Sequence, residues 1–166
     1  MAKEDVIFSR SKLRYNGSFD LTNIYKKLRM WIIQQGYSDP EEEKYVEKIK
    51  PEGKTIEFVW KTTKDKEGGY FCLAIKIEFF YKFIKDKEET YKGKKIKLDN
   101  GEAELFISST LVRNASGKWN EHGLMFKIYE KYIIADKIED YKIELYKDTN
   151  SLMEEIKNYL NLYKFG

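Results

Sequence analysis

The chain has 166 residues, which predicts one domain with enough core to be stable without disulfides or a structural metal. Charged residues make up 36% of it and hydrophobic residues 42%, and its 31 basic and 28 acidic residues leave a net charge of only +3. This balance excludes a disordered polyelectrolyte, and the composition excludes collagen-like, low-complexity and disulfide-scaffold proteins.

The first residues contain no apolar run typical of a signal peptide. The longest apolar segment, residues 70–84, is interrupted by Lys76, Glu78 and Lys82, so no membrane span is predicted. The single cysteine, Cys72, lies inside this segment and is interpreted as a small core residue. We therefore expect a cytoplasmic protein.

Lysine greatly outnumbers arginine, 27 to 4, and glutamate outnumbers aspartate, 19 to 9. A Lys/Glu bias is reported for hyperthermophilic proteins, and an AT-rich genome favours lysine codons as well. The scarcity of arginine also argues against phosphate recognition through its bidentate fork.

The first elements are a strand and a helix. Residues 6–15 are predicted to form a strand, and Asn16-Gly17 predicts the turn that ends it. Asp20 is a suitable N-cap and Gly36 a suitable stop for the helix that follows. Its expected buried stripe consists of Leu21, Ile24, Leu28, Trp31 and Ile32.

The middle of the chain alternates with the period of two that is typical of strands. An acidic run, residues 41–43, predicts a short second helix before this region, because anions favour a helix N-terminus. Turns are predicted at residues 51–53 and 68–69. The strands predicted around these turns are residues 45–49, 55–62 and 70–84.

Residues 85–95 are predicted to form a charged connection. Asn100-Gly101 is the strongest hairpin signal in the chain, and it predicts a hairpin joining residues 95–98 to residues 102–113.

Two further strands are expected before a last helix. Residues 124–134 fit both a strand and a helix, and we predict a strand because the neighbouring segments are strands. Residues 141–146 alternate and predict another strand. Ser151 and Glu154 have the spacing of a capping box, which predicts that the final helix begins there.

The element order is strand, helix, about six strands and helix. It predicts a single α+β domain over residues 1–166, an antiparallel sheet of six to seven strands with both helices packed on one face. This order is similar to that of helix-grip domains. The resemblance implies a curved sheet that wraps a helix and encloses an apolar cavity.

No strong catalytic motif is present. One histidine and one cysteine cannot build a zinc site, and the sequence contains neither a phosphate-binding glycine loop nor a nucleophile elbow. We therefore expect no catalytic residue, no metal site and no cofactor.

Aromatic residues make up 16% of the chain and are concentrated in the predicted strands. The leading hypothesis is a non-enzymatic module that uses an aromatic sheet face or cavity to bind a protein or an apolar small molecule. The alternative is a carrier of an apolar ligand, or an enzyme, of the helix-grip type. The residues expected to bind are Trp60, Phe79, Tyr81 and Phe106, together with Trp119 and His122 in a loop.

Residues 82–97 contain seven lysines against three acidic residues, with tyrosine interleaved. Lysines combined with stacking aromatic rings are typical of surfaces that bind single-stranded nucleic acid. This third hypothesis assigns nucleic-acid binding to Lys82, Lys85, Tyr91, Lys92, Lys94 and Lys95.

Overall fold

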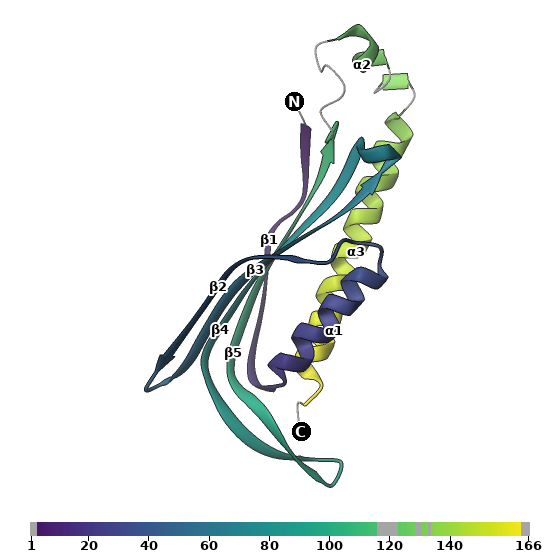
Figure 1. Ribbon diagram of the computed structural model, residues 1–166. Coiled ribbons are helices and arrows are strands. Elements are labelled where there is room, and N and C mark those ends of the chain that lie inside the picture. The colour runs from purple at the N-terminus through teal and green to yellow at the C-terminus, as the bar shows by residue number, and fades with distance from the viewer. Residues whose placement is uncertain (1–2, 116–122, 129–130, 133, 164–166) are drawn as a thin grey trace.

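A computed structural model of the chain describes residues 3–115, 123–128, 131–132 and 134–163. These residues form a five-stranded antiparallel sheet with strand order β1-β5-β4-β3-β2 and two long helices (Figure 1). The α+β class is confirmed, and the expected six to seven strands are too many. The elements are β1 (Lys3–Phe19), α1 (Leu21–Gln34), β2 (Glu41–Lys50), β3 (Gly53–Lys66), η1 (Glu67–Gly69), β4 (Phe71–Tyr91), β5 (Lys94–Arg113), α2 (Leu124–Ile128) and α3 (Ala135–Asn161).

The sheet is curved, and both long helices lie on its inner side, where α1 runs beside the C-terminal half of α3 (Figure 1). Strand alternation buries one face of each central strand against these helices. The buried side chains are at odd positions in residues 71–81 of β4 and 103–111 of β5, and at even positions in residues 56–62 of β3. Fully buried examples are Trp60, Phe79, Leu105 and Ile107.

Helix α1 begins and ends where its sequence predicts. Asp20 Oδ1 accepts a hydrogen bond from the Asn23 N–H at 3.1 Å, which satisfies one exposed donor of the first turn. Gly36 follows the helix with a φ of +92°, a conformation that glycine adopts without strain. Three residues of the stripe, including Leu28, are buried, whereas Trp31 is only partly buried.

The ladder between β4 and β5 bends sharply at one place. The register shifts between Lys82 and Lys85, and Phe83 has a φ of +56°. A Cβ at Gly101 would lie 2.8 Å from the Lys82 carbonyl oxygen and 2.6 Å from Ile84 Cδ1. Gly101 therefore allows the two strands to approach at the bend. The predicted hairpin at Asn100-Gly101 is wrong, since β5 runs through it unbroken.

Beyond the bend, β4 and β5 continue as a two-stranded hairpin that we call the arm (residues 85–98). The arm curls away from the other strands, below the N-terminal end of α1 (Figure 1). Its turn is formed by Lys92 and Gly93, both with positive φ. The charged connection predicted for residues 85–95 is thus a regular pair of strands, because each strand satisfies the backbone groups of the other.

Two segments predicted as strands are helical. Residues 124–128 form α2, and residues 141–146 lie inside α3, as does the capping box at Ser151 and Glu154. The alternation around Ile143 is misleading, because this side chain is 50% exposed. The face that packs against the sheet repeats every three to four residues instead: Leu145, Thr149, Leu152, Ile156 and Leu160.

The predicted short helix at residues 41–43 is also wrong, since these glutamates begin β2. Two of them contact side chains of the neighbouring strand β3. Glu43 forms an ion pair with Lys61 at 3.1 Å, and Glu42 accepts a hydrogen bond from the Trp60 indole N–H at 3.2 Å. Cross-strand pairing therefore prevails over the preference of acidic residues for a helix start.

Candidate functional site

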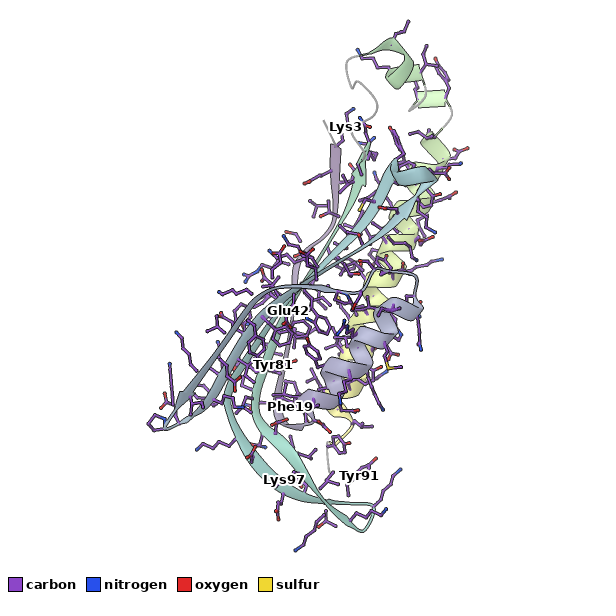
Figure 2. All side chains as sticks on the ribbon, viewed as in Figure 1. Lys3, Phe19, Glu42, Tyr81, Tyr91 and Lys97 are labelled. Atoms are coloured by element: carbon purple, nitrogen blue, oxygen red, sulfur yellow. The ribbon has the colours of Figure 1, made fainter. Side chains whose placement is uncertain are left out.

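A pocket of about 380 Å³ lies between the first half of α1 and the inner face of the sheet. Its walls come from α1, β2, β3, β4 and β5. Figure 2 shows Tyr81 and Phe19 projecting into the space between the sheet and α1, with Glu42 above them. The pocket lies at this place because the sheet is curved, and the curvature separates α1 from the outer strands.

Five of the twelve described residues that line the pocket are aromatic. Phe58 and Phe79 stack with centroids 4.3 Å apart, and Tyr25 of α1 approaches Phe58 at 5.8 Å from the helix side. Tyr45 from β2 stacks on Phe58 at 5.9 Å. With Tyr81, five rings line the pocket. Because neighbouring rings hold one another, the wall is preformed.

Trp60 supports this wall from behind. It lies beside the pocket, 5.1 Å from Phe79 and 5.0 Å from Tyr25 in edge-to-face contacts. Its indole N–H and the Tyr25 hydroxyl both donate to Glu42 Oε1, the latter at 3.1 Å. Glu42 therefore ties α1 to β3 at the end of the pocket.

The Tyr81 hydroxyl is the first polar group of the pocket. The residue is 2% exposed, and within the described part of the chain its hydroxyl makes no hydrogen bond. Burial raises the pKa of Tyr81, and the negative charge of Asp99 raises it further. The hydroxyl therefore stays protonated and can donate or accept one hydrogen bond.

Asp99 is the second polar group. Its Oδ2 accepts a hydrogen bond from the Leu21 N–H at 3.0 Å, at the first turn of α1. Desolvation raises the pKa of this half-buried carboxyl, and nearby Asp20 and Asp86 raise it further, against the opposing effects of the Leu21 N–H and Lys54. Among the described residues, Asp99 forms no ion pair.

Two of the charged residues that line the pocket, Lys54 and Glu47, are paired with each other. Lys54 Nζ lies 2.9 Å from Glu47 Oε1, and the Tyr45 hydroxyl donates to Glu47 at 3.2 Å. The hydrogen bond between Lys54 and Glu47 raises the pKa of Lys54 and lowers the pKa of Glu47. Lys26, exposed on α1, also lines the pocket and forms no ion pair among the described residues.

Three of the residues predicted to bind are brought together, namely Trp60, Phe79 and Tyr81. Phe106 is not with them, because its even position in β5 places it on the outer face of the sheet. There it contacts Phe80 edge-to-face at 5.6 Å and the Arg10 guanidinium at 3.9 Å. Strand parity alone separates Phe106 from the buried Leu105 and Ile107.

The loop residues Trp119 and His122 lie outside the described residues.

The residues predicted to bind nucleic acid fall into two places. Lys82 lies before the bend, opposite Glu102 on β5. Lys85, Lys92, Lys94 and Lys95 are exposed on the arm. Figure 2 shows Tyr91 and Lys97 on the arm, well below Tyr81.

Tyr91 contacts the Tyr163 ring edge-to-face at 5.1 Å, while the ammonium group of Lys92 lies 5.3 Å from its centroid. Elsewhere on the arm, Lys87 is paired with Glu89 at 3.0 Å. Tyr91, which belongs to the proposed stacking surface, therefore holds the arm against Tyr163, which follows α3.

Sequence reasoning missed several pocket residues. Phe58 had a visible signal, since it alternates in step with Trp60. Tyr25 and Tyr45 had none, because each lies outside the stripe or alternation that indicates burial. The hairpin predicted at Asn100-Gly101 would place Asp99 in its turn, whereas the structure places it in β5.

Within the described residues, no group of three or more His, Cys, Asp or Glu side chains could hold a metal ion. None of the helices in this part of the chain has both the length and the apolar character to cross a membrane. Compared with known proteins, the sequence matches no family model and no curated protein.

Proposed function

We propose that this protein binds an apolar small molecule in the pocket between α1 and the sheet. The observation that carries the proposal is the pocket of about 380 Å³ with five aromatic rings in its wall. Ligand sites in proteins commonly measure about 300–1,000 Å³ and combine apolar walls with a few polar groups. Tyr81 and Asp99 supply polar groups of this kind.

The arrangement of the elements supports the same proposal. A curved antiparallel sheet with α1 and α3 on its inner face supports the resemblance to helix-grip domains, which implies an apolar cavity between sheet and helix. The leading hypothesis of a binding module and the alternative of an apolar-ligand carrier thereby converge on one site.

The affinity expected for a ligand follows from its number of non-hydrogen atoms. Drug-sized ligands gain about 0.3 kcal/mol per non-hydrogen atom. A neutral aromatic probe with about 17 such atoms would gain roughly 5 kcal/mol, which corresponds to a Kd of about 0.2 mM or tighter.

The test uses N-phenyl-1-naphthylamine, a neutral probe whose fluorescence rises in apolar surroundings, with protein titrated into a fixed probe concentration. The blocking variant is Thr22→Trp, because Thr22 is exposed on α1 and borders the pocket. Its matched control is Thr90→Trp, an exposed threonine on the arm.

We expect saturable binding to the wild type and to Thr90→Trp, and binding at least about tenfold weaker to Thr22→Trp. Circular dichroism establishes that both variants are folded. Equal affinity of all three proteins for the probe would mean that it binds elsewhere, and absence of binding to the wild type would refute the proposal.

A further inference from the structure

The two polar groups of the pocket are incompletely satisfied. The Tyr81 hydroxyl makes no hydrogen bond within the described residues, although the side chain is 2% exposed. The Asp99 carboxylate has one hydrogen bond, from the Leu21 N–H, and no ion pair among these residues. Both groups line the same cavity and are close enough to interact electrostatically.

Four charged residues of the described part of the chain line the pocket, namely Lys26, Glu47, Lys54 and Asp99. Lys54 is held by Glu47 at 2.9 Å at the mouth, and Lys26 is exposed on α1. Asp86 is also exposed, and it borders Asp99 in the ladder between β4 and β5. Asp99 is therefore the partly buried charge of the lining that no ion pair holds within the described residues.

Such a site is matched by a cation rather than by an anion. A carboxylate in apolar surroundings loses hydration, and a ligand ammonium would replace this lost hydration with an ion pair. The faces of aromatic rings carry negative charge density and attract cations at short range. An anionic ligand would be repelled by Asp99 and by the same ring faces.

The geometry points to an aromatic primary amine as the ligand, with its ammonium between Asp99 and the Tyr81 hydroxyl and its ring against Phe58 and Phe79. This inference rests on the proposed function, since it concerns the same pocket. It adds the chemical class of the ligand and assigns a role to each polar group.

The experiment compares three indole probes by isothermal titration calorimetry with the full chain at pH 7. Tryptamine is a cation, tryptophol is neutral, and indole-3-propionate is an anion, while ring and chain length stay similar. We expect tryptamine to bind about tenfold or more tightly than tryptophol, and indole-3-propionate to bind weakest.

Three variants test which side-chain atoms produce the preference for tryptamine. Asp99→Asn keeps an oxygen that accepts the Leu21 N–H and removes the charge, so the preference for tryptamine over tryptophol should disappear. Asp86→Asn is the matched control, because it removes a neighbouring charge that does not line the pocket. Tyr81→Phe should weaken tryptamine binding about threefold to tenfold, the usual range for one hydrogen bond.

Binding should also depend on pH. Protonation of Asp99 removes the partner of the ammonium, so the affinity for tryptamine should fall as the pH drops through the pKa of this carboxyl. The groups that face it are Asp20, Asp86, Lys54 and the Tyr81 hydroxyl. Tryptophol affinity should change much less over the same range, because it has no charge.

The outcomes separate the two proposals. A preference for tryptamine that Asp99→Asn abolishes and Asp86→Asn retains supports the inference. Equal binding of all three probes, or a preference unchanged in Asp99→Asn, overturns the inference and leaves the proposed function standing. No binding of any probe, together with no binding of N-phenyl-1-naphthylamine, refutes the proposed function itself.

Discussion

The pocket and the arm are built from the same two strands, yet they differ in almost every physical property. Tyr81 and Tyr91 lie ten residues apart on β4, and Tyr81 is 2% exposed while Tyr91 is only partly buried. Before the bend, β4 has a strand on each side and helices over one face. After it, β4 pairs with β5 alone.

The comparison shows that coverage by other layers, rather than strand sequence, decides what an aromatic residue does here. Where β3 and α1 are present, rings pack into a wall that lines a pocket. On the arm, the ring of Tyr91 instead contacts Tyr163 near the end of the chain.

The largest effect is expected behind the pocket. Trp60→Ala removes a side chain that is 2% exposed and contacts both Phe79 and Tyr25. It should lower the free energy of unfolding by about 3–5 kcal/mol, the usual cost for a large core aromatic residue. Urea denaturation followed by far-UV circular dichroism measures this. A loss below 1 kcal/mol would mean that the wall is not part of the stable core.

The next effect is expected at the bend that separates the regions. A Cβ in Gly101→Ala would lie 2.8 Å from the Lys82 carbonyl oxygen, so the strands must move apart. We expect a loss of about 1–3 kcal/mol, typical of overpacking.

The control for Gly101→Ala is Gly68→Ala, in the turn before β4, where a Cβ would meet no atom within 4 Å. The alanine in Gly68→Ala should lower the free energy of unfolding only because residue 68 has a φ of +63°, which costs about 1–2 kcal/mol. Hydrogen exchange adds a sharper readout: only Gly101→Ala should increase exchange of arm amides.

A smaller effect is expected on the arm. Tyr91→Ala removes the edge-to-face contact with Tyr163, which should lower the free energy of unfolding by about 0.5–1.5 kcal/mol. The affinity for N-phenyl-1-naphthylamine should not change. A change in affinity as large as that of a pocket variant would show that arm and pocket act as one unit.

Asp99→Asn should change stability in a pH-dependent way. The pKa of Asp99 is raised above its ordinary value of 3.8, so the folded protein binds the proton more tightly than the unfolded chain. The stability that this proton contributes is complete below pH 3.8 and is lost as the pH rises through the folded pKa.

The variant should therefore be more stable than the wild type at pH 7, and the difference should shrink toward pH 3. Thermal unfolding at several pH values measures it, with Asp86→Asn as control. A difference that grows as the pH falls would contradict the raised pKa.

The smallest effect is expected from the arm lysines. Replacing Lys92, Lys94 and Lys95 by glutamine should leave the affinity of the pocket for tryptamine within about twofold. Lys95 is four residues from Asp99 along β5, roughly 13 Å of extended chain, which exceeds the screening length of about 8 Å at physiological salt.

The same triple variant tests the nucleic-acid hypothesis. If these three lysines bind single-stranded DNA, the affinity of the wild type falls as the salt concentration rises. In a plot of log affinity against log salt concentration, the slope of the wild type is then steeper than that of the variant by about two units. Equal salt dependence in both proteins would remove the arm from consideration as a nucleic-acid surface.

Local rules in the sequence were sufficient for part of this protein. The start and end of α1 follow from Asp20 and Gly36, because a cap and a left-handed stop act within one helical turn. The grouping of Trp60, Phe79 and Tyr81 follows from a period of two on neighbouring strands. Each of these inferences depends on residues that are close in the sequence or on one ladder.

The tertiary structure alone decided the rest. Residues 141–146 alternate like a strand, but packing of α3 against the sheet selects the longer helical repeat through Leu145 and Ile156. Gly101 looks like a turn residue and instead accommodates the β4 backbone at the bend. The role of Asp99 depends on where α1 begins, far away in the sequence. In each case the deciding contact joins distant segments, and no local pattern of residues encodes which distant segment will arrive.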